Sequence, residues 1–98
     1  MEFEKIKCVI KSEIASIKMN YPKNLNALDE PMLDDLLLAL DMLEEDENVK
    51  VIIISGEGKG FSAGGDIGMM LKGLESGDQK LGGLVRKAGL LAIKIRNI

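Results

Sequence analysis

The chain has 98 residues, of which 46% are apolar and 30% charged, and its formal net charge is -3. This balance is that of one small globular domain, and the weak negative charge excludes a general electrostatic attraction to nucleic acid or to an anionic membrane. Histidine is absent and Cys8 is the single cysteine, so we expect neither a disulfide nor a zinc site. No apolar leader follows Met1, and we expect no membrane segment and a cytoplasmic location.

The first two elements are expected to be strands joined by a hairpin. Residues 6–11 and 14–19 are rich in β-branched side chains, and only Ser12 and Glu13 separate them. The next stretch, residues 20–28, is dense in asparagine and contains a proline, which predicts a structured loop.

A helix should follow this loop. Asp29 suits the N-cap, and Glu30 and Pro31 suit the first turn. Leucines recur at helical spacing, at positions Leu33, Leu36, Leu37, Leu40 and Leu43. The acidic residues lie on the other side, and we expect the helix to end near Asp46.

Residues 49–55 are apolar at nearly every position, which predicts a strand buried on both faces of a parallel sheet, although no parallel partner is evident. After a glycine-rich loop, we expect a short helix at 67–71, a break at 73–77 and a last helix at 80–96. The order β-β-α-β-α-α is an α/β pattern. Three strands leave an edge uncovered and the last residues carry no C-cap signal, so we expect residues 1–98 to form a single, partial domain, the N-terminal fragment of a larger fold.

The loop sequence GEGKGFSAGGD, residues 56–66, permits several chemistries. Gly60 to Gly64 fits G-x-S-x-G, but six residues separate Ser62 from the end of the strand and the chain has no histidine to act as its base. The glycine spacing also fails the Walker and dinucleotide patterns. What remains is either a bare tight turn or a loop whose backbone N–H groups, around Gly65, converge on a developing negative charge.

Two motifs resemble those of the enoyl-CoA hydratase/isomerase (crotonase) superfamily. NYPKNLNAL at residues 20–28 is similar to N-x-P-x-x-x-N-A-L, and GEGKGFSAGGDI at 56–67 is similar to G-x-G-x-x-F-S-A-G-x-D-[ILV]. The resemblance runs over essentially the whole chain but covers the N-terminal part of the family's fold, the opening turns of a ββα superhelix. It implies acyl-CoA chemistry through an oxyanion-stabilised thioester enolate, as in hydration or isomerisation of an enoyl-CoA. Coenzyme A would enter as part of the substrate with no further cofactor, and the family forms homo-oligomers, trimers or hexamers.

The resemblance also implies roles for residues of the glycine-rich loop. Gly65 would supply one backbone N–H of the oxyanion hole. Ala63 and Ile67 match positions whose backbone lines the adenine end of coenzyme A. Asp66 matches an aspartate that organises the loop and caps the following helix, and it is not expected to act as a base.

Lys23 and Leu25 match the opposite wall of the coenzyme A site, where a lysine approaches the nucleotide phosphates; a solvated loop lysine is the other interpretation of Lys23. The family's second N–H donor and its acid/base carboxylates match no residue of this chain, so we expect the chain alone to be inactive. The alternative is a non-catalytic acyl-CoA-binding or structural module made from a truncated crotonase fold. The serine hydrolase interpretation of Ser62 lacks its base.

Overall fold

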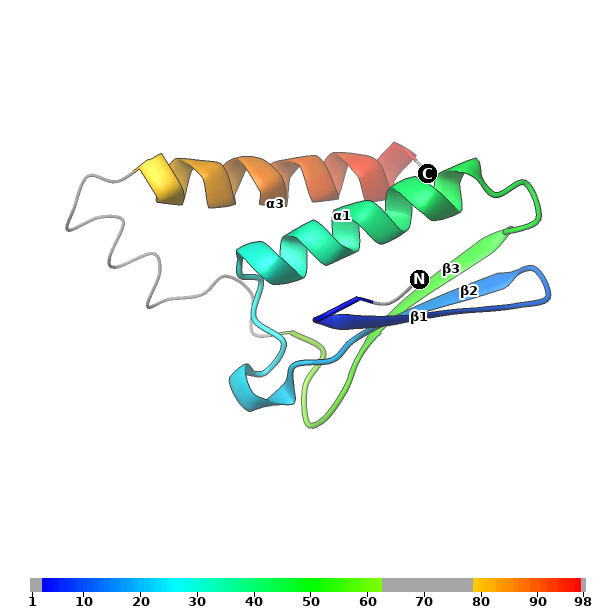
Figure 1. The fold of residues 1–98 in the computed structure, drawn as a ribbon, viewed down its shortest axis with the longest axis horizontal. Coiled ribbons are helices and arrows are strands. Elements are labelled where there is room, and N and C mark those ends of the chain that lie inside the picture. The colour runs from blue at the N-terminus through cyan, green and yellow to red at the C-terminus, as the bar shows by residue number, and fades with distance from the viewer. Residues whose placement is uncertain (1–2, 63–78, 98) are drawn as a thin grey trace.

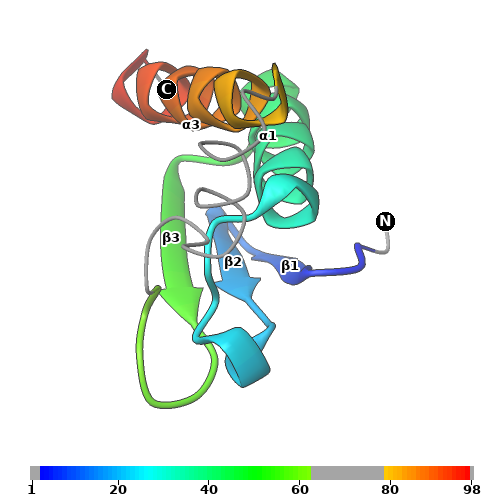
Figure 2. The ribbon, with the colours of Figure 1, turned by 90° about the vertical axis from the view of Figure 1, so that its left-hand side faces the viewer.

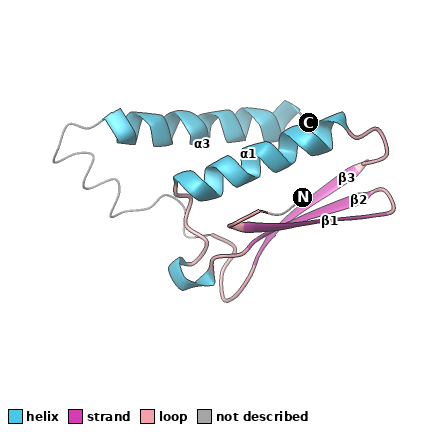
Figure 3. Cartoon of the chain, viewed as in Figure 1, coloured by secondary structure: helices cyan, strands magenta, loops and turns pink. Residues whose placement is uncertain are grey.

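The computed structural model describes residues 3–62 and 79–97, which form a sheet covered by helices. Strands β1 (Ile6–Lys11), β2 (Ile14–Met19) and β3 (Val51–Gly56) lie in the order β1-β2-β3. Helices α1 (Glu30–Glu45) and α3 (Gln79–Asn97) form a second layer (Figures 1 and 3), and the short 3-10 helix η1 (Pro22–Asn24) follows β2. The predicted α/β class is confirmed. The helix expected at 67–71 and the break at 73–77 lie outside the described residues.

The hairpin is confirmed residue by residue. β1 and β2 pair antiparallel, from Ile6 opposite Met19 to Lys11 opposite Ile14. Ser12 in the two-residue turn has a φ of 57°, the left-handed conformation that such turns require and that glycine or asparagine adopts more readily. The short connection and the twist of the strands therefore hold Ser12 in a conformation that its side chain does not favour.

Helix α1 begins where the sequence predicts. The carboxylate of Asp29 accepts the backbone N–H of Met32 at 2.9 Å, the contact of an N-cap. The helix ends at Glu45, with Asp46 as the C-cap. Its buried side chains are Met32, Leu33, Leu36, Ala39, Leu40 and Leu43. They form the core with the inward side chains of β1 and β2, which include Ile6, Ala15, Ile17 and Met19.

Strand β3 differs from its prediction in two respects. It does have a parallel partner, β2, with Ile14 opposite Val51 and Met19 opposite Gly56; α1 is the crossover between them that a parallel pair requires. It is not buried on both faces, since Val51 and Ile53 are 50% and 48% exposed. The reason is that both described helices lie over the same face of the sheet (Figure 2).

Helix α3, predicted at 80–96 and observed at Gln79–Asn97, runs beside α1. Its Leu91 reaches the core. Two of its lysines each bridge a pair of carboxylates on α1: Lys87 contacts Glu30 and Asp34, and Lys94 contacts Asp41 and Glu44. Within residues 3–62 and 79–97, no helix has the length and apolar character needed to cross a membrane.

Candidate functional site

The loops that follow β2 and β3 leave the sheet at the same edge. Because these strands are parallel, their last residues, Met19 and Gly56, lie opposite each other, and the two loops lie side by side in both views (Figures 1 and 2). In open α/β sheets, ligands bind outside the carboxyl ends of the strands. The loop pair, defined as residues 20–28 and 57–62, is therefore the candidate site.

One buried side chain joins the two loops. Asn26 is 0% exposed, and its amide nitrogen lies 2.9 Å from the carbonyl oxygen of Glu57, 3.3 Å from that of Gly60 and 3.2 Å from that of Phe61. Its amide oxygen accepts the backbone N–H of Tyr21 at 2.8 Å. Both ends of the side-chain amide are therefore satisfied, as a buried polar group requires.

The backbone of Asn26 adds to the connection. Its carbonyl oxygen accepts the Ser62 hydroxyl at 2.7 Å, and its N–H donates to the Tyr21 carbonyl at 3.0 Å. Leu25 and Asn26 have φ angles of 57° and 55°, a left-handed conformation that asparagine tolerates better than most residues. The Ser62 hydroxyl thus has a structural bond to a carbonyl, which favours the interpretation of Ser62 as a packed loop residue over that of a nucleophile.

Two glycines allow the loops to close. A Cβ on Gly56 would lie 2.2 Å from the carbonyl oxygen of Phe61, and a Cβ on Gly58, where φ is 91°, would lie 3.0 Å from the Cβ of Pro22. By contrast, a Cβ on Gly60 would have no atom within 4 Å. Gly56, the last residue of β3, is therefore needed for Phe61 to approach the strand, and Gly58 is needed for the second loop to approach Pro22.

The structure describes two of the predicted site residues. Lys23 is exposed within η1, and Leu25, directly after η1, is 50% exposed. Both belong to the same loop as Asn26, so the outer side of that loop presents a cationic and an apolar side chain. Ala63, Gly65, Asp66 and Ile67, which follow Ser62 in the chain, lie outside the described residues.

An apolar cavity of about 190 Å³ lies beneath the loop pair, between the sheet and the helices. Its lining comes from Met19, Leu28, Leu36, Ile54, Phe61, Ser62, Leu91 and Ile95. Apart from Ser62 these side chains are apolar, so the cavity favours an apolar group.

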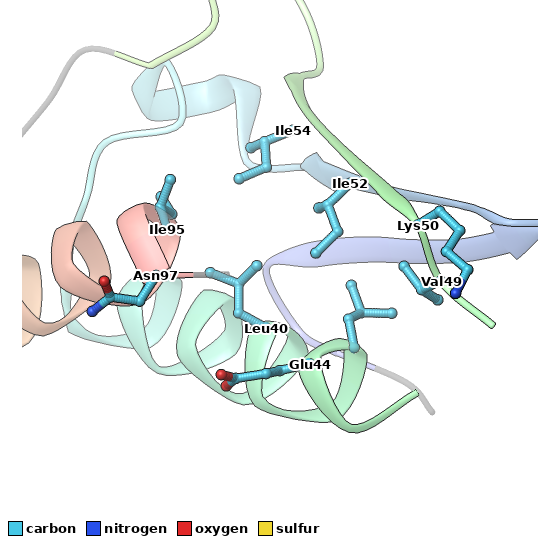
Figure 4. A pocket seen from close by; sticks show the side chains of 9 residues that line it. Leu40, Glu44, Val49, Lys50, Ile52, Ile54, Ile95 and Asn97 are labelled. Carbon is cyan, nitrogen blue, oxygen red and sulfur yellow. The ribbon is translucent and has the colours of Figure 1, made fainter. Parts of the chain in front are cut away.

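A larger hollow of about 530 Å³ lies along β3, toward the strand's other end (Figure 4). Leu40, Ile52, Ile54 and Ile95 form its apolar wall. Its charged residues already have partners: Glu44 accepts from Lys94 at 2.9 Å, and the Lys50 ammonium donates to the Glu47 carbonyl at 3.1 Å. The charged groups of this hollow are thus already engaged in hydrogen bonds. The smaller cavity beside the loops is the better candidate for a ligand-binding site.

Charged side chains around the loop pair are few and exposed. Glu57 pairs with Lys18 at 3.3 Å, but each side chain is 46% exposed, so the pair contributes little to stability.

Burial raises the pKa of the Cys8 thiol, which lies on β1 away from the loops. In the part of the chain that the structure describes, no three His, Cys, Asp or Glu side chains gather as a metal ion would require. What the loop pair offers is backbone groups, Lys23 and an apolar cavity.

The sequence alone gave no role to Asn26, although it lies within the motif at residues 20–28. The available signal was an asparagine between two apolar residues, Leu25 and Ala27. Its acceptors lie between 31 and 35 positions further along the chain, and no local pattern identifies them.

Comparison with known proteins adds a family match. Residues 9–95 match the family model described as enoyl-CoA hydratase/isomerase. The chain is 39% identical over 72 residues to 3-hydroxyisobutyryl-CoA hydrolase 1 of Arabidopsis thaliana, which covers 74% of this chain and 19% of that protein. It is 31% identical over 91 residues to trans-2-decenoyl-acyl-carrier-protein isomerase of Streptococcus mutans, covering 93% of this chain and 34% of that protein.

Among solved structures, human enoyl Coenzyme A hydratase domain-containing protein 3 aligns with a TM-score of 0.84 at 30% identity. The alignment covers 96% of this chain and 36% of the human chain. This chain therefore spans about a third or less of the length of these proteins.

Proposed function

Because this chain belongs to the enoyl-CoA hydratase/isomerase family, we propose that its loop pair binds an acyl-CoA thioester and helps to stabilise the enolate formed from it. The observation that carries this proposal is the joining of the two loops through Asn26 at the carboxyl ends of β2 and β3. This arrangement supports a site in which one ligand contacts both loops. A cytoplasmic location, the absence of any further cofactor and assembly into homo-oligomers belong to the same proposal.

The nucleotide end of coenzyme A is assigned to the outer side of the first loop. The exposed ammonium of Lys23 is available to the phosphates, and the half-exposed Leu25 is available to the adenine ring. The backbone of Ala63 and Ile67 would form the other wall, with Asp66 organising the turn between them. This assignment follows the family resemblance for each of these positions.

The thioester carbonyl is assigned to the N–H of Gly65. A fixed N–H donor aimed at the oxygen that gains negative charge stabilises the transition state by about 3–4 kcal/mol. Ser62, three positions earlier, is held by its bond to the Asn26 carbonyl, so the chain enters this segment from a fixed point. By the resemblance, the second donor and the groups that transfer protons match no residue of this chain.

The acyl group is assigned to the cavity of about 190 Å³ beneath the loop pair. Phe61 and Ser62 contribute to its lining from the second loop, so an acyl group there would lie close to the segment that carries Gly65. The apolar lining suits a hydrocarbon chain, and transfer of each methylene from water would contribute about 0.8 kcal/mol.

Calorimetric titration of coenzyme A and crotonyl-CoA into this chain tests the proposal. We expect saturable binding of both, weakened by Lys23→Ala and unaffected by Lys50→Ala, the matched exposed lysine at the other end of β3. Gly65→Pro, which removes the N–H, should weaken binding of crotonyl-CoA but not of coenzyme A, whereas Gly65→Ala keeps the donor and should weaken neither. Failure of either ligand to bind, or equal behaviour of the two Gly65 variants, would contradict the proposal.

A non-catalytic acyl-CoA-binding module is the second candidate. It is favoured by the polar side chains of the loop pair, because Asn26 and Ser62 are engaged in structural bonds and Glu57 pairs with Lys18. On either proposal we expect no hydration of crotonyl-CoA by this chain alone. Turnover above background by purified protein would show that a proton-transfer group is present after all.

A further inference from the structure

We propose that Asn26 is a positioning residue that makes the two loops move as one unit and sets the direction of the N–H groups that lead into the ligand-binding segment. What the loops bind rests on the proposed function above. The positioning role rests on contacts among described residues, and it can be tested without any ligand.

The side chain of Asn26 provides the main polar connection between the loops. Between residues 20–28 and 57–61, the described structure contains no backbone–backbone hydrogen bond. The bond from the Glu57 N–H goes instead to Met19, where it extends the β2–β3 pairing. Two further contacts between the loops are the Ser62 hydroxyl on the Asn26 carbonyl and the close approach of Gly58 to Pro22. Removing the Asn26 amide would therefore take away the side-chain hydrogen bonds to Glu57, Gly60 and Phe61.

The bonds to Asn26 also orient the peptide groups of the second loop. The carbonyl oxygens of Glu57, Gly60 and Phe61 all converge on one amide nitrogen. In a planar trans peptide, the N–H of the next residue points opposite to the carbonyl, and the described residues contain no cis peptide bond. The N–H groups of Phe61 and Ser62 must therefore point away from Asn26. Asn26 thus fixes the orientation of the backbone just before Gly65.

The geometry requires a donor at this position. An aspartate has nearly the same shape as asparagine, but when ionised it would place a second oxygen against three carbonyl oxygens. Protonation of this carboxylate would restore one hydrogen-bond donor. Burial among carbonyl oxygens should raise the pKa of such a carboxyl above its ordinary value of about 3.9.

Tryptic cleavage of the native chain measures the closure of the second loop. Lys59 is exposed in that loop, and Lys11, exposed beside the hairpin turn, provides an internal reference. We expect Asn26→Ala to raise the initial rate of cleavage after Lys59 by about tenfold or more, with little change after Lys11, because the loop opens more often. Asn24→Ala is the matched control, because among the described residues the Asn24 side chain accepts only the N–H of Ala27, in its own loop, at 3.3 Å. This variant should leave the Lys59 rate within about twofold.

Two results would overturn the positioning role. One is an unchanged rate after Lys59 in Asn26→Ala. The other is an equal rise after Lys59 and Lys11, because that result would show a general loss of stability rather than release of one loop.

The Asn26→Asp variant provides a rescue experiment. In ¹H–¹⁵N spectra, the Phe61 and Ser62 amide signals of this variant should be displaced from their wild-type positions at neutral pH. They should move back toward those positions as the carboxyl is protonated, while the wild-type signals stay in place over the same pH range. Displacement that does not depend on pH would contradict the requirement for a donor. Failure of coenzyme A to bind would instead overturn the proposed function and leave these results unaffected.

Discussion

Ile17 in β2 and Asn26 in the loop after it are both fully buried, yet their surroundings differ in kind. Ile17 lies in an apolar core with side chains of α1 such as Leu33 and Leu40. Asn26 is surrounded by backbone carbonyl and N–H groups at hydrogen-bonding distance. Apolar burial has little directional preference, whereas an amide requires each partner in its place. The stability of the layered core should therefore depend mainly on the apolar volume that is buried. The stability of the loop pair should depend mainly on the positions of its hydrogen-bonding and closely packed groups.

Leu33→Ala should have the largest effect on the core. Leu33 is 0% exposed beneath α1, and truncating such a leucine lowers the free energy of unfolding by about 2–5 kcal/mol. Urea unfolding measures the change. Leu38→Ala is the matched control, because Leu38 is 47% exposed on the same helix, and it should cost well under half as much. Equal costs would mean that the two sides of α1 are not buried as described.

Gly56→Ala tests the geometric demand of the loop pair. The added methyl would lie 2.2 Å from the Phe61 carbonyl oxygen, so the backbone must shift, at a cost of about 1–3 kcal/mol in the free energy of unfolding. Gly60→Ala adds the same methyl into open space and should change stability little. Thermal unfolding of the two variants makes the comparison, and equal melting temperatures would show that the second loop adjusts freely.

Asp29→Ala affects the boundary between the two regions, where the first loop becomes α1. Loss of the acceptor for the Met32 N–H should lower the free energy of unfolding by about 1 kcal/mol. Asp29→Asn keeps a side-chain oxygen at the N-cap and should lose less. If both variants were equally destabilised in urea, the charge of Asp29 rather than its hydrogen bond would be responsible.

The smallest effect should come from the two lysines between α1 and α3. The Lys87 ammonium donates hydrogen bonds to Asp34 and Glu30, which raise its pKa, Asp34 more than Glu30. The Lys94 ammonium donates to Asp41 and Glu44, which raise its pKa in the same way, Asp41 more than Glu44. A lysine whose pKa is raised in the folded state stabilises it below the ordinary pKa of about 10.4, and this contribution is lost as the pH rises through the higher folded value.

Urea midpoints of the wild type and of the Lys87→Met, Lys94→Met double variant should therefore differ slightly at pH 8 and less at pH 11. Lys7→Met, on the exposed side of β1, controls for the loss of a surface charge. A difference between wild type and double variant that stays constant with pH would exclude these ion pairs as its source.

Local patterns predicted much of the layered core. The predicted limits of β1 and β2 and the predicted start of α1 agree with the structure, because β-branched composition, a two-residue turn and an N-cap are each encoded within a few residues. The exposure of Val51 and Ile53 could not be predicted, since it depends on which face the helices cover. The role of Asn26 was also missed, because its acceptors come from the other end of a crossover. Lys23 and Leu25 are on the surface, where a ligand could reach them, and their roles stay predictions.

Strand β3 has β2 as its partner on one side, and the described residues place no strand on its other side. The sequence Val-Ile-Ile-Ile-Ser along this edge contains no charge and no proline, and segments of this kind pair readily with identical segments of other molecules. Lys50, directly before the strand, is the nearest charge that opposes such aggregation. We therefore expect this edge to limit the solubility of the chain, and Ile53→Lys, at a half-exposed position, to raise solubility without disturbing the core.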